Sequence, residues 1–262
     1  MNSEYSRAVL ELTVNIGETL LENGGEISRV QETMERVAKS YGCDQFHAYV
    51  LTNGIFASMD GREDGDGAVR HVPTTRVHLG RVAGVNELSR DIASGNVPPE
   101  EAAARLAAIR KLPYTSPAAS VAACAVGAGC FAVLFGGSVP EFAVAFFAGG
   151  VMQICAQKFL TGSMGKIITN ILLAAIVVLF GALGTAAAAA LGVAVNLDQV
   201  IIGGIIPLVP GMVLTTSFRD FANGDYLSGT IRIMDALLVA GSIAVGVGAV
   251  FAVRAALTGG VL

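Results

Sequence analysis

A segment with two prolines and several glycines could open a membrane helix to a small polar solute. Residues 203–211 read GGIIPLVPG, inside a longer apolar stretch. Proline lacks a backbone donor and clashes with the preceding helical turn, so Pro207 and Pro210 predict a broken helix. A break leaves free N–H and C=O groups, which discontinuous transporter helices use to bind their substrates. A plain structural kink is the alternative interpretation.

Polar side chains follow this break. Arg232 and Asp235 are spaced i, i+3 and therefore share one helix face, where a simple ion pair between them is the alternative to a functional role. A guanidinium matches the geometry of a carboxylate, so Arg219 or Arg232 is predicted to attract an acidic solute. Asp220 and Asp235 are the candidates for taking a coupling proton. The predicted substrate-binding residues are Pro207, Pro210, Gly211, Thr215, Thr216, Ser217, Arg219 and Arg232.

These residues lie in an apolar region, 116–262, that we predict to be a membrane domain of five transmembrane helices. The whole chain is 53% hydrophobic and only 15% charged, with a mean hydropathy of +0.62. A spanning helix needs about 20 apolar residues. A soluble all-α core is the alternative, but the long stretch 167–191 contains no charged residue, which argues against it. The predicted spans are about 118–135, 142–160, 167–191, 200–217 and 233–253.

Residues 1–115 differ in composition and are predicted to form a cytoplasmic α+β domain. They carry 12 of the 17 Lys and Arg residues and 16 of the 21 Asp and Glu residues. Periodicity predicts two helices, then three strands that include an Asn53-Gly54 hairpin turn, then two more helices. The expected helices are 4–22, 27–41, 82–94 and 98–111, and the expected strands are 45–52, 55–60 and 69–77.

The sequence predicts neither a metal site nor a catalytic site. Asp60, Asp64 and Asp66 resemble a calcium loop, but Arg62 stands at a ligand position. Zinc sites usually need four ligands; Cys43 and His47 lie four apart, with His71 and His78 later, but Cys43 and His47 fall across a predicted helix-to-strand boundary. Glu26 and Arg29, at the start of the second expected helix, could bind a ligand, with a local ion pair as the simpler interpretation. The four cysteines are interpreted as small packing residues. No catalytic residue, metal, cofactor or nucleic-acid partner is predicted. Glu141, at the end of the second span, is interpreted as a helix cap, with an outer-mouth role as the alternative.

The distribution of basic residues predicts the orientation. With residues 1–115 inside, the inward connections carry Lys158, Lys166, Arg219 and Arg232, whereas Arg254 alone falls outside. The positive-inside rule then places the N-terminus in the cytoplasm and the C-terminus outside. The first residues have no basic region or unbroken apolar core, so we expect no signal peptide.

Three stretches resemble the threonine/serine exporter (ThrE) family of bacterial membrane proteins. The first is Leu20–Val30, which contains Gly24-Gly25-Glu26-Ile27-Ser28-Arg29. The second is 76–111, with Asn86-Glu87-Leu88-Ser89 and Gly95 before Pro98. The third is the Pro-X-X-Pro-Gly segment, followed by Arg219-Asp220 and by Asp225, Ser228, Gly229 and Arg232.

The resemblance implies one subunit of a secondary transporter that exports small hydrophilic metabolites across the bacterial inner membrane. Family members are fused ten-helix chains, associated with threonine and serine, or split pairs, one type of which is associated with succinate. This chain is similar to the larger subunit of the split form, so the expected partner is a smaller five-helix subunit, or a second copy of the chain. A regulatory or assembly subunit and a membrane-tethered hydrolase are the alternatives.

Overall fold

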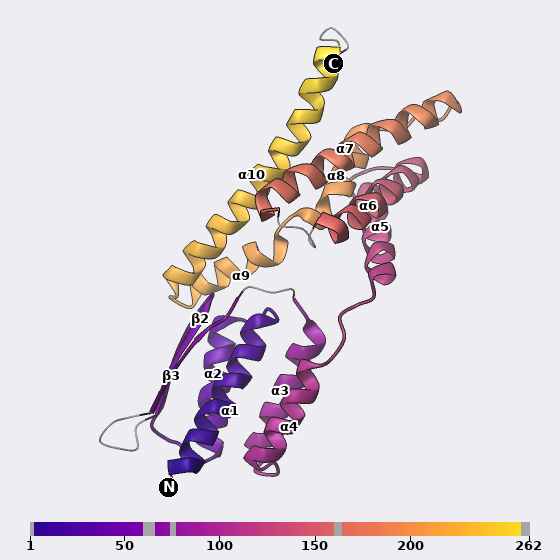
Figure 1. Cartoon of the computed structure of the whole chain (residues 1–262). Helices are drawn as coiled ribbons and strands as arrows, with labels where there is room; N and C mark the ends of the chain where they lie inside the picture. The colour runs from indigo at the N-terminus through magenta and orange to yellow at the C-terminus, as the bar shows by residue number, and fades with distance from the viewer. Residues whose placement is uncertain (1–2, 60–65, 74–76, 160–163, 258–262) are drawn as a thin grey trace. The chain divides into compact units, whose positions relative to one another are not determined.

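The computed structural model describes residues 3–59, 66–73, 77–159 and 164–257, and the chain forms two compact units (Figure 1). The N-terminal unit comprises Met1–Tyr114 together with Thr216–Ile231. The apolar unit comprises Thr115–Thr215 and Arg232–Leu262.

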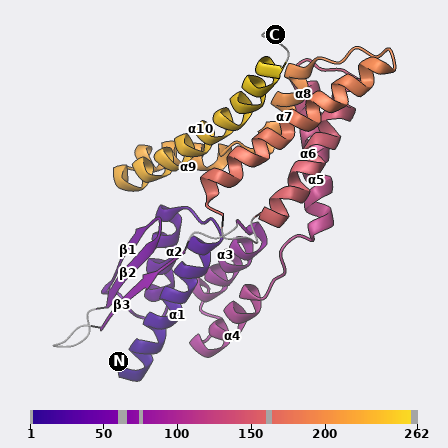
Figure 2. The ribbon, with the colours of Figure 1, turned by 45° about the horizontal axis from the view of Figure 1, so that its top comes forward.

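The N-terminal unit begins with helices α1 (Ser3–Glu22) and α2 (Ile27–Ser40), followed by an antiparallel sheet. Its strands are β1 (Phe46–Leu51), β2 (Gly54–Met59) and β3 (Asp66–His71), in the order β1-β2-β3. Alternate residues of β2 are buried, because one face of the sheet packs against α1 and α2 (Figure 2). The expected order of two helices, three strands and two helices is confirmed.

Strand β3 begins earlier and ends earlier than the expected 69–77. Asp66 pairs with Met59, so the strand includes residues before the expected start. Pairing ends at His71 because its partner, Gly54, is the first residue of β2; the Val72 N–H still donates to the Asn53 carbonyl at 2.9 Å. Of the rejected calcium-loop residues, Asp60 and Asp64 lie outside the described residues.

Helices α3 (Leu79–Ala93) and α4 (Pro99–Arg110) complete the main part of this unit. The Arg110 guanidinium joins α4 to α1: it donates to Thr19 Oγ1 at 2.7 Å and contacts Glu18 Oε2 at 2.8 Å. Tyr41, just after α2, donates its hydroxyl to the Val97 carbonyl at 3.0 Å and so holds the α3–α4 connection.

The apolar unit is helical. Its elements are α5 (Pro117–Leu134), α6 (Val139–Phe159), α7 (Lys166–Ala190), α8 (Leu197–Ile205), the 3₁₀ turn η1 (Ile206–Leu208), the first part of α9 (Gly211–Ala222) and most of α10 (Tyr226–Leu257). Four described helices, α5, α6, α7 and α10, are long and apolar enough to cross a membrane. The bent pair α8–η1 and α9 makes a fifth candidate if it counts as one span.

Small residues let α8 approach its neighbours closely. A Cβ added at Gly203 would lie 2.6 Å from the Ala128 carbonyl oxygen and 2.7 Å from the Ala132 nitrogen, both in α5. A Cβ added at Gly204 would lie 2.5 Å from Val177 Cγ1 in α7. Lipid gives helices little hydrophobic reason to associate, so this close backbone packing holds α8 against α5 and α7.

Gly203→Ala is expected to destabilise the protein, because the new methyl group meets backbone atoms of α5, which cannot rotate away. The cost should be about 1–3 kcal/mol, as for other overpacked sites, and should lower the thermal unfolding midpoint in detergent by several degrees. Gly127→Ala is the matched control, because an added Cβ there has no described atom within 4 Å. Equal midpoints for the two variants would contradict this packing.

Alkaline pH is expected to weaken the N-terminal unit through Tyr41. Burial, with smaller contributions from Tyr5, Glu100 and Glu101, raises the pKa of Tyr41 to about 12. Because the folded state favours the neutral phenol, its contribution is intact below the ordinary pKa of about 10 and is lost as pH rises towards 12. Denaturant unfolding between pH 9 and 12 measures this loss. Tyr41→Phe should flatten the pH dependence, and an unchanged slope would refute the assignment.

Candidate functional site

The predicted break in the fourth span is present. Helix α8 ends at Ile205, η1 follows, Val209 is extended (φ −65°, ψ 129°), and α9 starts at Gly211. The two helical parts are bent by 58°. Pro207 and Pro210 explain the interruption, since neither can donate an N–H to a helical hydrogen bond. The chain between the helices therefore carries peptide groups outside any regular helix.

The start of α8 is held in place by Glu141. Its carboxylate accepts a hydrogen bond from the backbone N–H of Ser138 at 2.8 Å and one from the N–H of Asn196 at 2.8 Å. Ser138 precedes α6, and Asn196 is the N-cap of α8, with its own side chain accepting from Asp198 N–H at 3.0 Å. One carboxylate thus caps its own helix and anchors the broken one, which supports the capping interpretation of Glu141.

The residues at the break are accessible. Pro207 and Gly211 are exposed and Pro210 is partly buried. Thr215, one turn into α9, is exposed, and its hydroxyl contacts the carbonyl oxygens of Gly211 and Met212 at 3.1 and 3.0 Å. The Thr215 hydroxyl therefore turns back towards the first turn of α9, beside the break.

An ion pair that the sequence did not predict joins α7 and α10. Lys166 Nζ lies 2.8 Å from each carboxylate oxygen of Asp235, and the two side chains are 60% and 43% exposed. The sequence pointed to Asp235 but used Lys166 only as evidence for orientation. Their separation of 69 positions hid the pairing, because only the packing of α7 beside α10 brings their ends together. Arg232 precedes Asp235 by one turn of α10 and is half-buried.

Four other predicted residues belong to the N-terminal unit. They lie in the segment Thr216–Ile231, the hairpin of α9 and α10, which we call the docking hairpin. Ser217 and Asp220 are buried at 0% and 2% exposure, and Thr216 is half-buried. Arg219 is the exposed member, and its Nη1 lies 2.7 Å from Glu26 Oε2 at the N-terminus of α2. The sequence placed Glu26 with Arg29 as a possible binding pair or, more simply, a local ion pair, and that pair is present, with Arg29 Nε 3.6 Å from Glu26 Oε2.

The predicted site residues are therefore divided by unit. The apolar unit holds Pro207, Pro210, Gly211, Thr215, Arg232 and Asp235, and the N-terminal unit holds Thr216, Ser217, Arg219 and Asp220. Each group gains an ionic partner from a distant part of the sequence: Lys166 for Asp235, and Glu26 for Arg219. Neither partner follows from local spacing.

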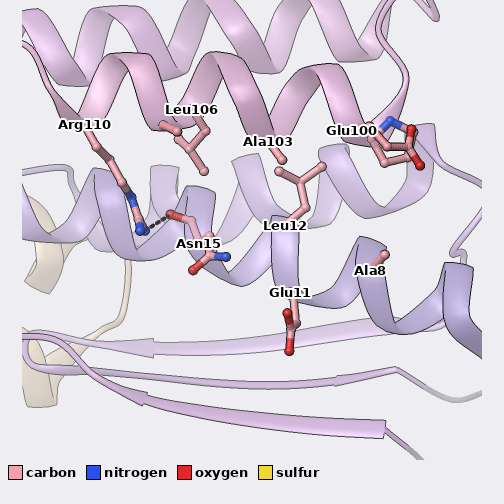
Figure 3. Close-up of a pocket in the computed structure, with 10 residues that line it drawn as sticks. Ala8, Glu11, Leu12, Asn15, Glu100, Ala103, Leu106 and Arg110 are labelled. Carbon is pink, nitrogen blue, oxygen red and sulfur yellow. Dashed lines mark hydrogen bonds between the residues drawn. The ribbon is translucent and has the colours of Figure 1, made fainter.

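A groove of about 400 Å³ lies between α1 and α4 in the N-terminal unit (Figure 3). Leu12, Leu106 and alanine side chains form most of its lining, and Arg110 lies at one end, where it donates to the Asn15 carbonyl at 2.9 Å. Glu100 lies towards the other end. The sequence predicted no site at these residues. The wall is mainly apolar, and its one guanidinium already bonds to α1.

Comparison with known proteins tests the resemblance to the threonine/serine exporter family. A family model described as "Putative threonine/serine exporter" (ThrE) matches residues 11–254. A Mycobacterium tuberculosis (strain ATCC 25618 / H37Rv) protein named "Probable threonine/serine exporter" is 26% identical over 252 residues, which cover 93% of this chain. The chain spans 46% of that relative's length. No solved structure matches the chain. Because the family model covers the broken span, the docking hairpin and most of both units, the chain belongs to the threonine/serine exporter (ThrE) family.

Proposed function

We propose that this chain is one part of a secondary transporter that exports small hydrophilic metabolites across the bacterial inner membrane. The candidate solutes are threonine, serine and dicarboxylates such as succinate. The observation that carries the proposal is the bent, interrupted helix pair in a unit otherwise made of apolar helices. A scaffold helix gains nothing from two prolines in lipid, whereas a transport path needs peptide groups that face water.

The proposed solute path starts at Pro207, Pro210 and Gly211 and continues along α9 through the hydroxyls of Thr215, Thr216 and Ser217. Arg219 and Arg232 are proposed to attract a solute carboxylate. Asp220 and Asp235 are the proposed proton carriers. The exposure of Pro207, Gly211, Thr215 and Arg219 supports their part in this assignment, because a solute must reach these groups from water; the buried Ser217 and Asp220 are assigned from the sequence alone.

For the arrangement in the membrane, we propose a cytoplasmic N-terminus and an external C-terminus, as the basic residues predict. The chain spans 46% of the length of the relative named a probable threonine/serine exporter. We propose that a smaller five-helix subunit of the same family, or a second copy of this chain, supplies the rest. Co-purification of that subunit with a tagged full chain would support the first arrangement.

Cysteine labelling tests the proposed path. In a background that lacks Cys43, Cys124, Cys130 and Cys155, Thr215→Cys should react with a membrane-impermeant thiol reagent, and the reaction should block export. Leu179→Cys in α7 is the matched control: its side chain is 48% exposed, but we expect lipid to cover it. Absence of labelling at position 215 in an actively exporting preparation would remove the path and favour a regulatory subunit.

The Lys166–Asp235 pair provides a second test. Exposed ion pairs contribute only about 0.2–1 kcal/mol, so Asp235→Asn should change the unfolding midpoint little. If Asp235 carries the coupling proton, the same variant should reduce export about tenfold or more, measured with radiolabelled threonine, serine and succinate.

Asp91→Asn is the control for this variant, because it breaks a similarly exposed pair, with Arg105, in the N-terminal unit. It should leave export unchanged. Normal export by Asp235→Asn would exclude this carboxylate from the mechanism.

A further inference from the structure

The ion pair between Arg219 and Glu26 joins residues 193 positions apart and is asymmetric in its exposure. The Glu26 side chain is 11% exposed, whereas that of Arg219 is 58% exposed. The carboxylate is thus largely shielded at the start of α2, while the guanidinium on the docking hairpin is open to water. A solute carboxylate can therefore reach Arg219 without first uncovering it.

Glu26 leaves most of the guanidinium unused. A guanidinium has five N–H donors and binds a carboxylate best through two parallel hydrogen bonds. Among the described residues, the Arg219 side chain makes one hydrogen bond, from Nη1 to Glu26 Oε2 at 2.7 Å. A solute carboxylate in the plane of the guanidinium could accept two parallel hydrogen bonds from it. It can therefore compete with the single hydrogen bond that Glu26 accepts.

Glu26 also has partners that remain if Arg219 leaves. Arg29, one turn into α2, places its Nε 3.6 Å from Glu26 Oε2, and the Ser28 hydroxyl donates to Glu26 Oε1 at 3.3 Å. Removing one partner from a buried ion pair is costly when it leaves a charge uncompensated. Arg29 and Ser28 reduce that cost, because the shielded carboxylate keeps a cation and a donor.

We propose that Glu26 is an intramolecular competitor for the carboxylate of the exported solute at Arg219. In the protein without bound solute, Glu26 forms the ion pair with Arg219 and so ties the docking hairpin to α2. When a solute carboxylate binds Arg219, Glu26 turns to Arg29, and the hairpin loses its ionic tie to α2. Glu26 is thus a positioning residue that sets the affinity of Arg219. This proposal rests on the proposed function, because it needs a carboxylate solute.

The proposal predicts opposite effects on the apparent KM for removing Glu26 and for removing its cationic partners. Uptake of radiolabelled threonine, serine and succinate is measured in everted membrane vesicles from cells that express the full chain and the smaller five-helix subunit proposed as its partner. Glu26→Gln should lower the apparent KM about threefold to tenfold, with little change in the maximal rate. Arg219→Gln should raise the KM more than tenfold. Arg29→Gln should raise it about twofold to threefold, because Glu26 then loses its second cation.

Glu35→Gln is the matched control, since it removes the same charge from an exposed position of α2, where the carboxylate bonds only to Gln31 among the described residues. It should leave the KM unchanged. A role limited to stabilising the fold would raise the KM or reduce the maximal rate in Glu26→Gln, and it cannot lower the KM.

Two outcomes overturn the proposal in different ways. In the first, the wild-type chain transports a solute, but the KM of Glu26→Gln equals or exceeds the wild-type KM. This result refutes the exchange and leaves the proposed function intact. If wild-type vesicles accumulate none of the three solutes above vesicles without the protein, the proposed function fails, and the exchange fails with it.

Discussion

The rest of the structure depends on the need of every peptide group in lipid for a hydrogen-bond partner. Five helical candidates can meet this need internally, except where Pro207 and Pro210 interrupt one of them. Such an interruption is stable only where protein or water satisfies the exposed groups. Close packing holds the helix before the break: Gly203 and Gly204 bring α8 against α5 and α7, and Glu141 fixes its first residues. The irregular segment then begins from a rigid helix.

Beyond the break, α9 and α10 each contribute residues to both units. Helix α10 runs from Tyr226 to Leu257 and is longer than the hydrocarbon core of a bilayer is thick. Its first residues belong with the docking hairpin in the N-terminal unit, and its remainder belongs with the apolar helices. Arg219 therefore belongs to the N-terminal unit and Asp235 to the apolar unit.

Much of this arrangement was predictable from local pattern. The Asn53-Gly54 signal predicted the hairpin, since neighbouring residues determine a turn, but the two-residue turn is Thr52-Asn53 and Gly54 already pairs with Leu51. The long apolar runs predicted spanning helices, and the two prolines predicted the break. The start of β3 was predicted less well, because its pairing with Met59 depends on a cross-strand register that a single strand does not encode.

The sequence by itself determined which helices are apolar, where the fourth span must break, and which polar groups follow the break, because each depends on residue type and short spacing. Only the tertiary structure decided that Asp235 meets Lys166, that Arg219 meets Glu26, and that Glu141 anchors α8. Those contacts join residues between 55 and 193 positions apart. Packing of distant helices creates them, and local periodicity carries no record of which helix ends will meet.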